Sequence, residues 1–189
     1  MAVKLWTVHF MRICVANLLL FISLYILFPV LSVEMADRLG VPVAQTGVIF
    51  LFFTLGMFLI GPFHAYLVDE YKRKHVLLYS ALIMLAAVLG YAFVDGYTKF
   101  LLLAAVQGAC FGLATTAGIT VAIDITTSAR RSAGNMVYAW AARLGMLVGV
   151  VLGIGMYRMY GFRMVTYLSV AAGLASIFLS LIHISEPTR

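Results

Sequence analysis

Three polar side chains interrupt long apolar runs of this chain: Asn17, Gln107 and Arg143. Arg143 is the strongest candidate of them, because an ionisable group deep in an apolar segment usually faces a cavity or a polar partner. Asn17 and Gln107 are neutral groups that either hydrogen-bond to a neighbouring helix or contact a solute. We therefore take all three as candidates for lining a path. For Arg143 the alternative is a helix that starts later, which would place this side chain near the interface.

The composition indicates a chain that lies in a membrane. Its 189 residues are 64% hydrophobic and 11% charged, whereas soluble domains are about 25% charged and nearer half apolar. The net charge of +6 is better explained by membrane topology and anionic headgroups than by nucleic acid. Cys14 and Cys110 lack the spacing of a metal site or a redox pair. We therefore expect membrane lipid around the chain, and no metal, cofactor or nucleic acid.

Six segments are apolar enough to cross a bilayer, which takes about 20 residues each. They span residues 12–33, 43–68, 76–94, 100–122, 136–156 and 164–181. The loops between them, including outer loops at 34–40 and 157–163, are too short to hold a soluble domain. The predicted fold class is therefore an all-α membrane protein, with a bundle of six transmembrane helices over residues 1–181.

The C-terminal end differs from the rest of the chain. Polar residues begin abruptly after the sixth segment, and the stretch from Ser180 to Arg189 resembles the conceptual translation of a sequencing adapter. We interpret residues 182–189 as a non-native tail and exclude His183 and Glu186 as site candidates. The alternative is a genuine short cytoplasmic tail.

Basic residues set the predicted orientation. More of them lie on the side of the predicted membrane where the chain begins, namely Lys4, Arg12, Lys72, Arg73, Lys74, Arg130 and Arg131. Fewer lie on the opposite side, namely Arg38, Lys99, Arg158 and Arg163. By the positive-inside rule, the N-terminus and the loops at 69–74 and 124–131 lie inside. We expect an integral protein of the cytoplasmic (inner) membrane.

The loop at 65–74 resembles the signature between the second and third helices of the major facilitator superfamily of transporters. That signature runs Gly-x-x-x-Asp-Arg-x-Gly-Arg-Arg/Lys. Asp69, Arg73 and Lys74 match it, and three residues replace its other positions: Ala65, Glu70 and Lys72.

A second loop is similar to the same family's link between helices four and five, an acidic residue followed by a basic pair. Here these residues are Asp124, Arg130 and Arg131. The two loops face the same side of the predicted membrane, and their opposite charges predict a cytoplasmic gating latch. The alternative is a pair of solvated loops, in which exposed ion pairs contribute only about 0 to 1 kcal/mol.

The fourth predicted helix carries Gln107 and Gly108, which resemble the family's motif Arg-x-x-Gln-Gly, with Ala104 at the Arg position. Gly108 and Gly112 are also an ordinary pair of small residues for close helix packing.

The fifth predicted helix carries glycines at four-residue spacing, at 145, 149 and 153. Gly145, Gly149 and Gly153 share one helix face, which lets a neighbouring backbone approach closely. The stripe also resembles the family's antiporter motif, Gly-x-x-x-Gly-Pro-x-x-Gly-Gly, with Val150 and Ile154 at the Pro and last Gly positions. Arg143 points away from this stripe, by about 200° around the helix.

The resemblance implies the N-terminal six-helix half of a transporter whose two halves enclose a substrate site near the midplane. The implied activity is secondary active transport of a small solute by alternating access, by analogy efflux. The implied partners are the solute, a coupling ion and the missing C-terminal half of the same protein.

Two other classes of protein remain as alternatives, an intramembrane enzyme with six spans and a membrane scaffold that transports nothing. The sequence contains neither a Gly-x-Ser-Gly nucleophile nor a His-Glu-x-x-His zinc motif, so we expect no enzymatic activity. A phosphate-binding Gly-Lys-Ser/Thr loop is also absent, which gives ATP-driven transport no support. Arg143 within a span argues against the scaffold.

Overall fold

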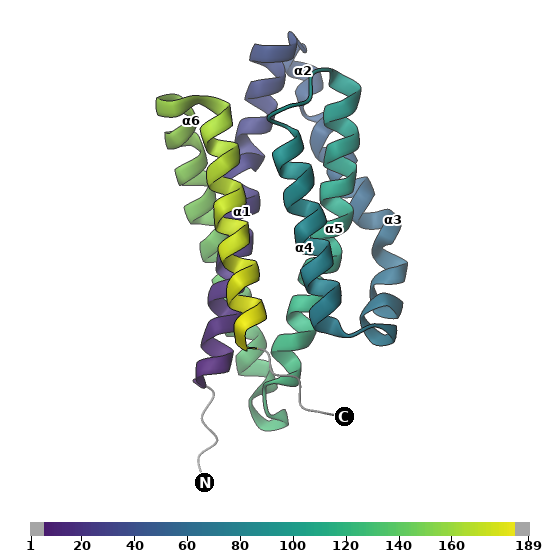
Figure 1. Ribbon diagram of the computed structural model, residues 1–189, viewed down its shortest axis with the longest axis vertical. Helices are drawn as coiled ribbons and strands as arrows, with labels where there is room; N and C mark the ends of the chain where they lie inside the picture. The colour runs from purple at the N-terminus through teal and green to yellow at the C-terminus, as the bar shows by residue number, and fades with distance from the viewer. Residues whose placement is uncertain (1–5, 184–189) are drawn as a thin grey trace.

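The computed structural model describes residues 6–183, and all of the regular elements in this range are helices. The helices run along the long axis of the molecule (Figure 1). In chain order they are α1 (Val8–Leu39), α2 (Val43–Thr46), α3 (Val48–Glu70), α4 (Arg73–Gly90), α5 (Tyr97–Asp124), the short 3₁₀ helix η1 (Ser128–Arg130) and α6 (Arg131–His183). The predicted all-helical class is confirmed for this range. The interpretation of residues 182–189 as a tail falls mostly outside the described residues.

Five helices in the described range are long and apolar enough to cross a membrane, whereas the sequence predicted six segments. The difference lies in α6, which has 53 residues and would measure about 80 Å if straight. It is broken at Gly161, whose φ of 76° and ψ of 179° are not helical. The predicted segments 136–156 and 164–181 both lie within α6, and the predicted loop at 157–163 shrinks to this one glycine.

The contacts of α6 with α1 show that the chain reverses at Gly161. Before the break, Gly145 lies against Leu18 and Gly153 against Ile26, so this part runs parallel to α1. After the break, hydrogen bonds join position 169 to position 23 and position 176 to position 16, so this part runs antiparallel. Figure 1 shows the same reversal where α6 turns from green to yellow.

The first helix is longer than its apolar segment. The sequence placed a loop at 34–40, but α1 continues to Leu39 and ends at Gly40, whose φ of 65° suits a glycine cap. Arg38 explains the extension, because it pairs with Glu34 one turn earlier at 3.6 Å and with Asp95 of the α4–α5 connection. An ion pair between side chains one turn apart stabilises the helix beyond the apolar segment.

Small residues bring two pairs of helices into close contact. In the α1–α6 pair, a Cβ added at Gly145 would lie 2.5 Å from the carbonyl oxygen of Leu18. In the α3–α5 pair, Gly108 lies directly against the backbone of Phe53, and Gly56 against that of Ala105. The predicted packing glycines of both helices therefore lie at interfaces, although Gly112 contacts side chains rather than backbone.

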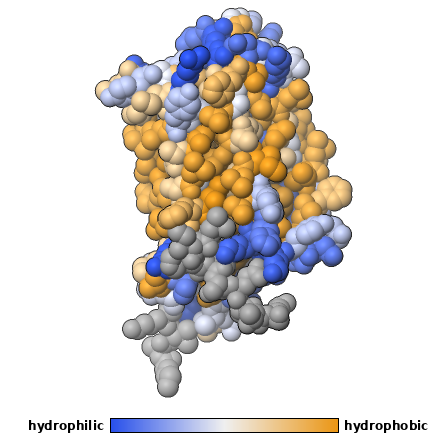
Figure 2. Space-filling model, in the orientation of Figure 1, coloured by the Kyte–Doolittle hydropathy of each residue, from blue (hydrophilic) through white to orange (hydrophobic). Residues whose placement is uncertain are grey.

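The surface has the polarity of a body embedded in lipid. Figure 2 shows a broad hydrophobic band between hydrophilic ends. Many large apolar side chains are exposed, Phe58, Leu147 and Phe178 among them. Such a surface is stable in lipid and costly in water. The chain is therefore an integral membrane protein.

We expect Gly153→Ala to lower the free energy of unfolding by about 1–3 kcal/mol, because the added methyl group would overlap the backbone of Ile26. The matched control is Gly155→Ala, where a Cβ would meet nothing within 4 Å. The control should be neutral or gain up to about 1 kcal/mol from helix propensity. Equilibrium unfolding in detergent, followed by circular dichroism, measures both, and equal stabilities would contradict the packing role of Gly153.

Candidate functional site

Arg143 lies on an exposed face of α6. Its guanidinium carbon is 5.7 Å from the centroid of the Trp140 ring, within the range of a cation–π interaction. Trp140 is itself 62% exposed. Gly145 is buried against α1 on another face of the same helix. One side of α6 is therefore packed, and the side that carries Arg143 is uncovered by the described chain.

Asn17 is buried between α1 and α6, with 3% of its surface exposed. Its side-chain nitrogen donates a hydrogen bond to the carbonyl oxygen of Tyr138 at 3.0 Å. Its side-chain oxygen is shielded and has no partner. The amide thus joins two helices, which is the interhelical bonding that we considered as an alternative from the sequence.

Gln107 is also buried, at 1% exposure. Its Oε1 accepts a hydrogen bond of 2.9 Å from the hydroxyl of Tyr91, beyond the end of α4, and its Nε2 has no partner. Of the three candidates for lining a path, Asn17 and Gln107 are therefore buried at helix contacts, and Arg143 is exposed. Periodicity places a residue on a helix face, but the rotation of the neighbouring helices decides whether that face is covered.

His64 of α3 forms a polar contact that sequence reasoning missed. Its Nδ1 lies 3.3 Å from the hydroxyl oxygen of Thr116 on α5. That hydroxyl donates its one hydrogen to the carbonyl oxygen of Gly112 at 2.9 Å, so a neutral His64 donates from Nδ1. Its Nε2 then presents a lone pair that is shielded and without a partner. The signal for this contact in the sequence was Gly112, one turn before Thr116, because the absence of a side chain there leaves room for His64.

An aromatic cluster that we did not predict from the sequence joins three helices at a half-buried face. From α1, the Phe21 ring lies 5.3 Å from Phe111 of α5, and the Phe28 ring lies 4.5 Å from Phe50 and 5.3 Å from Phe53 of α3. Phe21, Phe28 and Phe50 are only half-buried. The spacing of seven residues between Phe21 and Phe28 was the signal, since it places both rings on one face of a helix.

The predicted gating residues come together around Arg73. This side chain contacts the carboxylate of Asp124 at the end of α5 and lies 3.9 Å from Asp69 of α3. All three are partly exposed. Arg130 and Arg131 are exposed in the connection that follows Asp124. The α3–α4 loop and the end of α5 therefore lie at the same end of the molecule.

The comparison with known families decides the class. The family model of the Major Facilitator Superfamily matches residues 13–189. The chain belongs to the Major Facilitator Superfamily. The resemblance seen in the sequence is thereby confirmed. A search of curated proteins finds no match. Members of this superfamily are transporters that bind small molecules in membranes.

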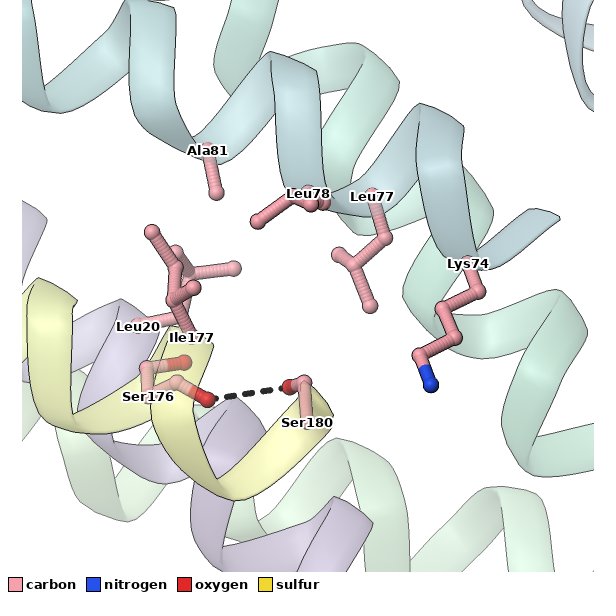
Figure 3. Close-up of a pocket in the computed structure, with 8 residues that line it drawn as sticks. All are labelled: Leu20, Lys74, Leu77, Leu78, Ala81, Ser176, Ile177 and Ser180. Carbon is pink, nitrogen blue, oxygen red and sulfur yellow. Dashed lines mark hydrogen bonds between the residues drawn. The ribbon is translucent and has the colours of Figure 1, made fainter. Parts of the chain in front are cut away.

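The last residue of the superfamily signature is Lys74. It lines a small cavity between α1, α4 and the end of α6 (Figure 3). Leu77, Ala81 and Ile177 make most of this cavity apolar, and its volume is about 20 Å³. That is enough space for little more than one water molecule, so this cavity cannot hold a solute of the superfamily. Within residues 6–183 no group of three or more His, Cys, Asp or Glu could hold a metal ion.

We expect Tyr91→Phe to destabilise this superfamily member by about 1–3 kcal/mol, because it leaves a buried acceptor of Gln107 without its donor. Adding Gln107→Met should recover most of the loss, since replacing both polar partners by apolar groups is nearly neutral. Unfolding in detergent compares the single and double variants. A double variant no more stable than Tyr91→Phe would contradict the pairing.

Proposed function

We propose that this chain is the six-helix half of a secondary transporter, which moves a small solute across the cytoplasmic membrane by alternating access. The observation that carries the proposal is the uncovered Arg143. It lies twelve residues after Arg131, the first residue of α6, which is about 18 Å along the helix. A cation at this depth is costly in lipid and is normally found facing a polar cavity or a partner.

The architecture that we propose is the two-bundle one of the superfamily. The two antiparallel parts of α6, together with α1, α3, α4 and α5, make six crossings and return the chain to its starting side. A second bundle, the C-terminal half of the same protein, covers the face with Arg143 and Trp140. The substrate path then lies between the halves, near the midplane.

Further residues supply candidate contacts for the solute. The half-buried rings of Phe21, Phe28 and Phe50 form an apolar surface over α1 and α3. The unpartnered Nε2 of His64 offers a hydrogen-bond acceptor between α3 and α5. We propose a solute with an apolar or aromatic body, exported rather than imported. Export is the direction that the resemblance of the Gly145 stripe to the antiporter motif supports.

Thiol labelling in membranes tests the path without knowledge of the solute. Cys14 and Cys110 are first replaced by Ser or Ala, and a single cysteine is introduced by Arg143→Cys. We expect a charged, membrane-impermeant thiol reagent to label it, because thiolates form in water and not in lipid. Leu174→Cys, at an exposed apolar position after Gly161, is the control and should stay unlabelled. An unreactive cysteine at 143 beside a labelled one at 174 would refute the path.

For the charged loops we propose a gating role at the cytoplasmic end. Reversing the charge by Asp124→Arg should reduce transport about tenfold. A change of this size lies within the coupling free energies of about 1–3 kcal/mol that are typical between two sites. Membrane insertion should persist, since partly exposed ion pairs contribute only about 0 to 1 kcal/mol to stability. The control is the charge swap Arg73→Asp with Asp124→Arg, which restores the attraction and should recover transport.

Efflux of a panel of fluorescent solutes from cells, with surface expression measured in parallel, compares these variants in the full protein that includes the C-terminal half. A reversal that leaves efflux unchanged, or a swap that recovers nothing, would contradict the gating role.

A further inference from the structure

The positive charge of Arg143 is not neutralised by any group in the described part of the chain. No carboxylate of residues 6–183 forms an ion pair with it. Its guanidinium contacts the ring of Trp140 instead. An aromatic face attracts a cation but carries no net negative charge, so the guanidinium still lacks a counter-ion.

The carboxylates of residues 6–183 lie towards the two ends of the bundle. At one end are Glu34, Asp37 and Asp95, and at the other are Asp69, Glu70 and Asp124. Arg143 lies between these two groups, because Gly145 beside it packs against Leu18 in the interior of α1. Glu34 follows Leu18 by sixteen residues, which is about 24 Å along the helix.

Distance makes these carboxylates poor partners for Arg143. In the other direction, Arg143 is twelve residues from the start of α6, or about 18 Å. Because the Coulomb energy falls with the inverse of distance, a carboxylate at about 18 Å attracts the guanidinium roughly a fifth as strongly as one at about 4 Å. The compensating anion therefore comes from outside residues 6–183.

We propose that the transported solute supplies this anion, as a carboxylate held by Arg143 beside the Trp140 ring; this inference rests on the proposed function. A guanidinium presents five N–H donors in a planar fork, which binds both oxygens of one carboxylate. The structure leaves these donors unused by residues 6–183. The exposed ring of Trp140 offers a flat surface on which an aromatic body stacks.

The single positive charge selects among anionic solutes. A carboxylate balances it, whereas a phosphate monoester carries a charge of about −1.5 to −2. The excess negative charge of the phosphate would stay unpaired in a site of low dielectric, which is costly. A cationic solute would be repelled. The class of solute is therefore a monovalent organic carboxylate with an apolar or aromatic body.

Binding of matched probes to the full protein, which includes the C-terminal half, tests the proposal. The probes are the carboxylate, the primary amide and the methylammonium derivatives of naphthalene, and the same three derivatives of indole. The probes of each set share a ring system and differ in charge. Binding is measured as the rise in the midpoint of thermal unfolding in detergent, because a ligand that binds the folded state stabilises it. We expect the carboxylates to give the larger rise.

Variants at position 143 separate charge from shape. Arg143→Gln should weaken binding of the carboxylates about tenfold to a hundredfold, as for the loss of a hydrogen bond to a charged group, and leave the amides unchanged. Arg143→Lys should be intermediate, because it keeps the charge and loses the planar fork. The control is Arg158→Gln, which removes an exposed arginine from the same helix near Gly161. Circular dichroism establishes that each variant is folded.

Three results would overturn the proposal. One is stabilisation by the amides or the methylammonium probes that equals or exceeds that by the carboxylates, and another is stabilisation by none of the carboxylates. The third is an equal loss for all probes in Arg143→Gln, which would assign the counter-ion to a carboxylate of the C-terminal half. Thiol labelling at position 143 tests the path by itself, so each of these results leaves the proposed function standing.

Discussion

The close approach of α1 to α6 is the constraint on which the rest of the structure depends. Lipid is as apolar as a leucine side chain, so helices in a membrane gain little from burying hydrophobic surface against one another. Association then relies on tight contact, and Gly145, Gly149 and Gly153 provide it by lying against the backbone of α1. Glycines of α3 and α5 do the same for a second pair. The two pairs are joined through α4, which packs against both α5 and α6.

This packing decides which polar groups remain available for chemistry. Asn17 and Gln107 face neighbouring helices, where they bond to Tyr138 and Tyr91 and lend specificity to the contacts. Arg143 shares α6 with the glycine stripe but points elsewhere, so the same close contact that fixes the helix leaves the guanidinium uncovered. A transporter needs this division, because one face must hold the bundle together while another meets the solute.

The two ends of the bundle are organised by charge rather than by packing. At one end, Arg73 connects the α3–α4 loop to Asp124 of α5. At the other, Arg38 connects the extended end of α1 to Asp95, and the Tyr157 hydroxyl donates to Glu34 at 3.3 Å. The carboxylates of Asp95 and Asp124 are exposed to solvent, so their ion pairs orient the connections at little energetic gain, whereas Glu34 is buried. The apolar band between the ends sets the depth of the whole body in the membrane.

The sequence by itself determined the membrane class, the family, the approximate limits of most helices and the glycine-bearing faces, because these follow from apolar length, composition and short local spacings. It did not determine that α1 extends through Glu34 to Leu39, or that the predicted loop at 157–163 contracts to Gly161. Only the tertiary structure decided these points, along with the burial of Asn17 and Gln107, the His64–Thr116 contact and the aromatic cluster. Each depends on residues far apart in the chain meeting across helices, and the relative rotation of packed helices leaves no trace in local periodicity.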